Sequence, residues 1–201
     1  MKRIASGLAI RITKGNNNQE LFEVYSYCFQ VIMETLVTMM TNIIIALWLK
    51  MLLEYIILIV IFVSVRSCMG GLHMSTFFRC YIFTNFAIAL TLVSTKICLL
   101  NNPINTLVTM CCVLAVYYFA PVQSINRPLS DCEKTAIKIR LRQILLRVGF
   151  LAIAAFLLKS NFFLLILRGT MILALITEIA GIIKNYIDSS GININSKPKS
   201  V

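Results

Sequence analysis

Charged side chains are scarce in this chain. Only 13% of its 201 residues are Asp, Glu, Lys or Arg, about half the share of roughly 25% in soluble domains. Hydrophobic residues make up 59%, and the mean hydropathy is +0.85. This composition excludes a soluble globular protein and predicts an all-α, polytopic integral membrane protein. The net charge is +11. The excess basic residues are expected to lie in cytosolic loops, and no nucleic-acid binding is predicted.

Histidine is nearly absent, and the cysteines lack metal-binding spacing. The chain has one histidine, His73, and its seven cysteines form no CxxC pair. A single histidine cannot build an HExxH zinc site, so we expect no metal and no other cofactor. The cysteines inside apolar runs are predicted to act as small hydrophobic side chains. The others would face the reducing cytosol, so no structural disulfide is expected.

Long apolar runs dominate the rest of the sequence. A crossing needs about 20 apolar residues, and six runs predict about six transmembrane helices. Several runs are short, so four crossing helices plus re-entrant pieces are the alternative. No Gly or Pro separates the first two runs. A single helix over 31–65 would be about 50 Å long, which is too long for one crossing, so a tight helical hairpin is predicted instead. The runs are 31–49, 51–65, 81–100, 104–120, 144–158 and 162–183.

The basic residues predict the orientation in the membrane. With both termini in the cytosol, fifteen of the nineteen basic residues lie inside, which is a strong positive-inside bias. The segment from His73 to Cys80 then lies at the cytosolic face, beside a basic loop at 121–143. Ser130 and Glu133 have capping-box spacing, so a basic helix is predicted to begin near Asp131. The four outer residues are Lys50, Lys96, Lys159 and Arg168.

The remaining segments complete a single membrane-embedded domain, predicted over 1–187. Residues 1–30 are expected to be an amphipathic region. Its first part, 1–14, is predicted to form a helix on the cytosolic leaflet, and a disordered basic tail is the alternative. The loop 121–143 either sets the topology and touches anionic lipid or docks an acidic peptide. The tail at 188–201 is rich in Ser, Asn, Gly and Lys and is predicted to be disordered.

Three acids fall in or near the apolar runs. Acidic residues inside a membrane are functional candidates by default, which applies to Glu34, Glu54 and Glu178. Lys50 precedes Glu54 by four residues, so a local ion pair is the simpler explanation for that acid.

His73 and Cys80 form the candidate reactive pair, within a segment at 66–80. An imidazole can take the proton of a cysteine thiol and produce the nucleophilic thiolate. Seven residues of one helix would separate the two by about 10 Å along the axis, which is too far for proton transfer. Gly70 and Gly71 allow a tight turn that would bring His73 over the start of a helix carrying Cys80.

That helix would also help the chemistry, because Ser75 or Thr76 could cap it and its N-terminus favours an anion. Two other interpretations stay open. The dyad could form between two protomers, or the histidine could be structural and the cysteine a packing residue.

These residues resemble the signature of the accessory gene regulator B (AgrB) family. The family pattern is an Arg, then Gly-Gly-x-His, then a Cys seven residues after the His, and it matches Arg66, Gly70-Gly71-Leu72-His73 and Cys80. The resemblance covers most of the chain, including Asn18–Glu23 and Arg127–Leu129. Two departures are Leu72, where the family often has an aromatic residue, and Met74, where Ala is usual.

The resemblance implies a membrane cysteine endopeptidase of Gram-positive quorum sensing, located in the bacterial cell membrane. Its partners would be an AgrD-like pro-peptide substrate, membrane lipids and a second copy in a homodimer. Cys80 would be the nucleophile and His73 the general base. Cleavage would release an acidic tail and leave the peptide core as a thioester, from which a lactone or thiolactone ring forms. A peptide transporter or exporter without proteolytic activity is the alternative.

The resemblance also suggests roles for residues around the pair. Arg66 and Arg79 would bind the acidic tail or the new carboxylate, although interfacial arginines that snorkel are equally compatible. Gly70 and Gly71 would shape the backbone and supply an N–H group for the oxyanion.

Overall fold

The computed structural model describes residues 7, 10, 19–69, 77–98, 100–120 and 131–189. These residues contain six long helices and no strand, so the predicted all-α class is confirmed. The helices are α2 (Gln19–Trp48), α3 (Leu52–Met69), α4 (Phe77–Ile97), α5 (Asn102–Phe119), α6 (Asp131–Leu157) and α7 (Asn161–Ser189).

The helices have the length and composition of a polytopic membrane protein. Five of them, α2, α3, α4, α5 and α7, are long and apolar enough to cross a membrane. Helix α6 differs because its first half carries the basic residues and its second half the apolar run. The apolar part, 144–157, is about 21 Å long, so a crossing by α6 depends on Arg147 reaching an interface with its side chain.

Each of the six predicted runs corresponds to one helix, but some boundaries differ. Helix α2 begins at Gln19, twelve residues before the first predicted run, so much of the region expected to be amphipathic continues into it. Helix α6 begins at Asp131, as the capping box predicts, and runs without a break into the predicted span. Helix α7 extends to Ser189. The predicted helix at 1–14, apart from Gly7 and Ile10, and the tail after 189 lie outside the described residues.

The predicted hairpin between the first two runs is present, and a lysine makes its turn. Lys50 has φ 56°, in the left-handed region that usually favours glycine. The N–H of Met51 donates to the carbonyl of Ala46 at 2.9 Å, and that of Lys50 to Leu47 at 3.0 Å. This pair of bonds is a Schellman motif, which ends a helix tightly.

The turn between α6 and α7 repeats this arrangement at Lys159, with φ 54°. Lys50 therefore serves as a helix terminus. In the described part of the chain no ion pair joins it to Glu54, so that prediction was wrong.

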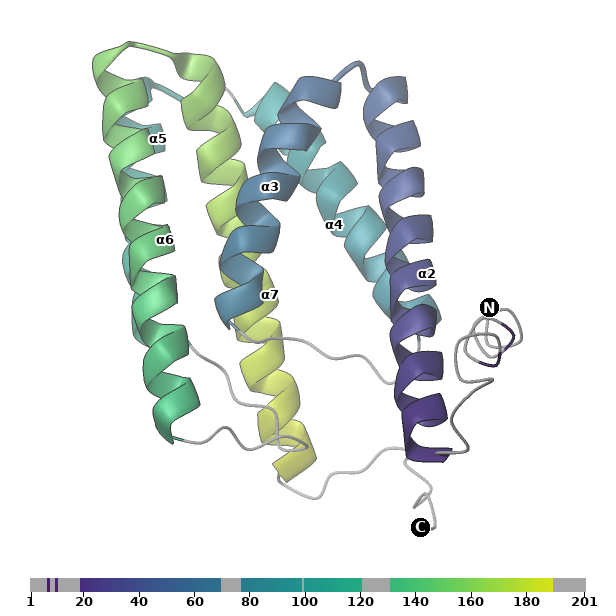
Figure 1. The fold of residues 1–201 in the computed structure, drawn as a ribbon. Coiled ribbons are helices and arrows are strands. Elements are labelled where there is room, and N and C mark those ends of the chain that lie inside the picture. Colours follow the sequence, from purple (N-terminus) through teal and green to yellow (C-terminus); the bar gives the residue numbers. More distant parts are fainter. Residues whose placement is uncertain are drawn as a thin grey trace.

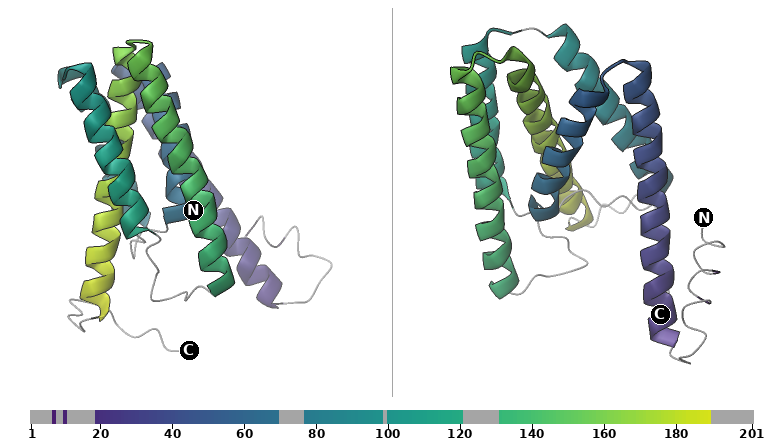
Figure 2. Two further views of the ribbon diagram at one scale, coloured as in Figure 1. Left: turned by 90° about the vertical axis from the view of Figure 1, so that its left-hand side faces the viewer. Right: turned by 45° about the horizontal axis from the view of Figure 1, so that its top comes forward.

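The six helices alternate in direction along the bundle (Figure 1). The end of α3 and the start of α4 lie at the same end of the bundle as the start of α6 and the end of α7. Helix α7 packs against α3, α4, α5 and α6, whereas α2 packs mainly against α3 and α4. Figure 2 shows α2 at the edge of the bundle, away from α5 and α6.

A buried arginine of α7 lies at the end of the bundle where α4 connects to α5. Arg168 is 4% exposed. Its Nη1 donates to Asn105 Oδ1 at 2.7 Å, and its Nη2 to the carbonyl of Cys98 at 2.9 Å. The Nδ2 of Asn105 donates in turn to the carbonyl of Leu100 at 2.9 Å. These bonds hold the connection between α4 and α5 against α7.

Helices α4 and α7 approach closely at Gly169. A Cβ on this glycine would lie 2.8 Å from Cγ2 of Thr95 and 3.1 Å from Cγ2 of Thr91. Both threonines are fixed, because the Oγ1 of Thr91 donates to Ala87 and that of Thr95 to Leu92, each at 2.7 Å. Small residues at such crossings allow close backbone packing between membrane helices.

We therefore expect Gly169→Ala to lower the free energy of unfolding by about 1–3 kcal/mol through overpacking. Gly149 provides the matched control, because a Cβ there would meet only the flexible side chain of Met110, at 3.8 Å. Gly149→Ala should be neutral or stabilising by up to about 1 kcal/mol. Thermal unfolding in detergent measures both, and equal midpoints for the two variants would contradict the packing argument.

Candidate functional site

Cys80 lies one turn into α4, as the sequence predicts for the nucleophile. The helix begins at Phe77, so Cys80 is its fourth residue. Its side chain is half-buried, and its Sγ lies 4.0 Å from Oγ1 of Thr84.

Cys80 lines a pocket enclosed by α2, α3, α4 and α7. The pocket has a volume of about 530 Å³, within the range of about 300–1,000 Å³ for small-molecule sites. Its wall is mainly apolar, with a few hydroxyl and amide groups. Cys80 is therefore a half-buried thiol in the wall of a cavity.

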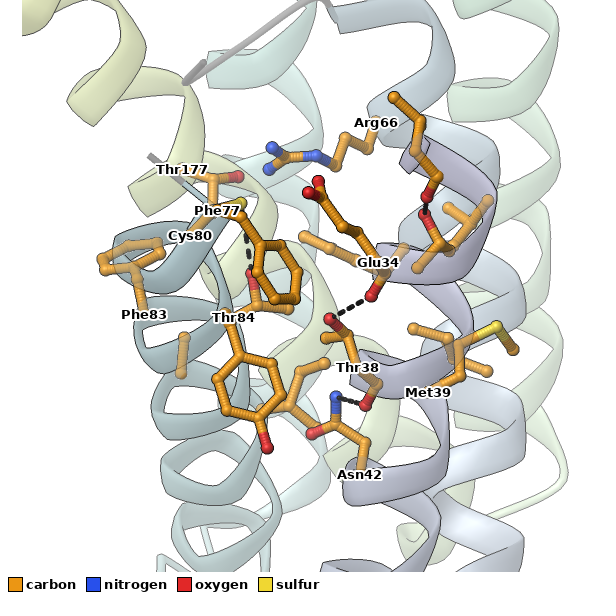
Figure 3. Close-up of a pocket in the computed structure, with 18 of the residues that line it drawn as sticks. Glu34, Thr38, Met39, Asn42, Arg66, Phe77, Cys80, Phe83, Thr84 and Thr177 are labelled. Atoms are coloured by element: carbon orange, nitrogen blue, oxygen red, sulfur yellow. Dashed lines mark hydrogen bonds between the residues drawn. The ribbon is translucent and has the colours of Figure 1, made fainter. Parts of the chain in front are cut away.

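Two opposite charges lie near the thiol. Figure 3 shows Arg66 of α3 and Glu34 of α2 pointing toward one another on the same side of the pocket as Cys80. The guanidinium carbon of Arg66 lies 5.8 Å from the centroid of the Phe62 ring. The Oε1 of Glu34 accepts a bond from Gln30 Nε2 at 2.8 Å. A peptide group entering the pocket here would meet a cation, an anion and a thiol together.

The predicted site residues divide into three groups. Arg66 and Cys80 line the same pocket. Arg79 is exposed and does not line it, although it precedes Cys80 in the sequence. His73, Gly70 and Gly71 lie outside the described residues.

Chain length permits His73 to reach Cys80. Helix α3 ends at Met69 and α4 starts at Phe77, so His73 is four residues from the start of the helix. Four residues span at most about 14 Å, and Cys80 lies about 4.5 Å further along the axis. The connecting chain is therefore long enough to fold back over the thiol within one protomer.

Comparison with known proteins identifies the family. A model of the family described as Accessory gene regulator B matches residues 2–177. The chain belongs to the accessory gene regulator B family. No match was found among curated proteins or solved structures. The AgrB family takes part in processing the autoinducer of the accessory gene regulator system.

The AgrB match includes the whole pocket, whose lining residues run from Tyr27 to Thr177. Sequence reasoning found only part of this lining. It missed the polar face of α2, where Gln30, Glu34, Thr38 and Asn42 follow one another at intervals of four. This spacing puts them on one side of a helix, and a polar stripe in an apolar span could have indicated the pocket.

Glu178 is the most buried acid of the described chain. It lies on α7 directly after Thr177 and is 1% exposed, and neither carboxylate oxygen has a hydrogen-bond partner. It does not line the pocket that contains Cys80. The acid that the pocket brings near the thiol is Glu34, so only this one of the three candidate acids is part of the site.

No described group suggests a metal centre. Among the residues described, no cluster of three His, Cys, Asp or Glu side chains could hold an ion. The six cysteines with described side chains are free, and four of them are at least partly exposed.

Proposed function

We propose that this protein is a membrane cysteine endopeptidase that cleaves an AgrD-like pro-peptide and retains its core as a thioester on Cys80. The observation that carries the proposal is the position of Cys80, one turn into α4 and in the wall of a pocket. A nucleophilic thiol must be both accessible to substrate and close to a base. His73 lies within reach along the chain, and membership of the AgrB family supports peptide processing.

The reaction begins when His73 accepts the proton of the Cys80 thiol. The thiolate attacks the carbonyl carbon at the end of the peptide core and forms a tetrahedral intermediate. The C–N bond then breaks, the imidazolium returns its proton to the leaving amine, and the tail departs. The core remains bound to Sγ as a thioester.

A Cys or Ser side chain of the core then attacks the thioester carbonyl. His73 accepts the proton of that side chain, the bond to Sγ breaks, a lactone or thiolactone ring forms, and Cys80 leaves as a thiolate that the imidazolium reprotonates. Hydrolysis competes with this step, so the site must keep water away from the thioester. The mainly apolar wall of the pocket suits that requirement.

The arrangement of charges supports the proposed cytosolic orientation. The end of the bundle that carries the start of α4 also carries the basic first half of α6. The positive-inside rule favours a cytosolic location for this end, where a newly made peptide would meet Cys80. Arg66 stands at that side of the pocket and is suited to hold the acidic tail or the new carboxylate. The homodimer expected from the family stays a prediction.

Capture of the acylated enzyme tests the proposal. The full-length protein is expressed in membranes with the pro-peptide encoded beside its gene, quenched in acid and digested for mass spectrometry. We expect a peptide containing Cys80 to carry the mass of the core, and hydroxylamine to remove it because thioesters are labile to this nucleophile. Tail release without any adduct on Cys80 would refute the mechanism. Transport of the intact peptide without cleavage would favour the exporter alternative.

A further inference from the structure

Two buried polar side chains line the pocket far from its charged side. Asn42 of α2 and Tyr55 of α3 are each 2% exposed, yet Asn42 Oδ1 and the Tyr55 hydroxyl have no hydrogen-bond partner. Figure 3 shows Asn42 at the opposite end of the pocket from Arg66. Tyr55 precedes Arg66 by eleven residues of the same helix, about 16 Å along its axis. Unpaired polar groups are costly in a membrane interior, so these two are suited to a ligand that pairs with them.

The orientation of the Asn42 amide is defined. Its Nδ2 donates to the carbonyl of Thr38 at 2.9 Å, and a carbonyl oxygen can only accept, so Oδ1 is the buried atom without a partner. Asn42 therefore offers an acceptor, and the Tyr55 hydroxyl can offer a donor. One acceptor and one donor in an apolar wall complement the N–H and C=O groups of a peptide backbone.

The size and charge of this part of the pocket also fit a neutral peptide. On α4 the lining extends from Phe77 to Ile88. The part from Cys80 to Ile88 is about 12 Å long, which is the length of three or four extended residues. Among the described residues that line the pocket, Arg66 is the only basic one and Glu34 the only acidic one. Both lie on the side near Cys80, so the end with Asn42 accommodates uncharged side chains.

We propose that Asn42 and Tyr55 form a subsite that binds the backbone of three or four uncharged substrate residues next to the bond attacked by Cys80. The inference rests on the proposed function, because it takes the pro-peptide as the ligand. It goes further by assigning the residues that recognise it and the part of the peptide they hold.

The test measures peptide affinity separately from catalysis. The full-length Cys80→Ala protein in lipid nanodiscs is titrated into the pro-peptide encoded beside the gene, labelled with a fluorophore at its N-terminus, and anisotropy is recorded. In this background, we expect Asn42→Leu and Tyr55→Phe each to raise the dissociation constant about tenfold, the factor that corresponds to one lost hydrogen bond. The unliganded variants should unfold at the same temperature as their parent or higher, since each loses an unpaired buried polar atom.

Asn85 provides a matched control in the next helix of the pocket. Its Nδ2 also donates to the carbonyl four residues earlier, Tyr81, at 2.7 Å, and its Oδ1 is also without a partner. Asn85 is similarly buried, at 8% exposed, but it does not line the pocket. Asn85→Leu should therefore leave the peptide affinity within about twofold of the parent.

The outcomes separate the subsite from the catalytic proposal. Unchanged affinity in both Asn42→Leu and Tyr55→Phe would overturn the subsite and leave water as the partner of the two polar atoms. Equal weakening by Asn85→Leu would also overturn it, because the effect would then come from the helix packing. If the peptide binds as expected but wild-type Cys80 is never acylated, the subsite stands and the peptidase mechanism fails.

Discussion

Cys80→Ala is expected to reduce release of the peptide tail by about 10³-fold or more, since it removes the only atom that forms the acyl bond. His73→Ala should cause a loss of similar size, because the thiol then has no base positioned to activate it. Both variants are measured by co-expression with the pro-peptide and quantification of the free tail. Because the two residues act as one unit, the double variant should be no less active than either single one.

Cys111→Ala supplies the control for this prediction. Cys111 is exposed on α5 and lies in an apolar span outside the pocket. Its replacement should leave tail release unchanged. If His73→Ala lowered the rate only a few-fold, Glu34 would become the candidate base, because it is the acid that the pocket brings near the thiol.

Arg168→Met is expected to destabilise the protein by about 2–3 kcal/mol. The change leaves the buried Asn105 Oδ1 and the part-buried carbonyl of Cys98 without their donors, and a buried acceptor left unpaired costs about 1–3 kcal/mol. Removing a buried charge offsets part of this cost. For a chain of this size the unfolding temperature in detergent should fall by roughly 5–10 °C. Arg168→Lys should recover only part of the loss, because an ammonium lacks the planar fork that reaches both acceptors.

Lys96→Met is the matched control at the same end of the bundle. Lys96 lies in the last turn of α4 and is exposed, so exchanging it for methionine removes an equal charge without breaking a buried network. Its unfolding temperature should change by less than about 2 °C. An equal drop in both variants would mean that net charge, and not the Arg168 network, determines the effect.

The sequence was sufficient to predict the helices and the hairpin between the first two. Apolar runs of near-membrane length are a strong local signal, and each of the six predicted runs corresponds to one helix. The capping box at Ser130 correctly predicted the start of α6, because a helix N-terminus depends on a few neighbouring residues. The hairpin at Lys50 was predicted from length alone. Its Schellman geometry was not, since lysine is an unusual residue for a left-handed position.

The pocket could be predicted only in part, because it is a tertiary feature. Arg66 and Cys80 were identified from the signature around them, but nothing local in the sequence relates α2 to that signature. Asn42 and Tyr55 become candidates only when packing buries them beside the same cavity. In the same way, nothing in the sequence distinguishes Gly149 from Gly169, and only the neighbouring helices make a larger side chain unfavourable at Gly169.

The polar face of α2 affects how the protein is inserted during synthesis. Helix α2 is made before α3 and α4, so Glu34 and Asn42 would face lipid if this helix left the translocon alone. Acidic and amide side chains make such release unfavourable. The turn at 49–51 is short, and α3 carries only two charged residues, Glu54 and Arg66, each within a few residues of a helix end. Release of α2 and α3 as a pair would keep these polar side chains away from lipid until α4 completes the pocket.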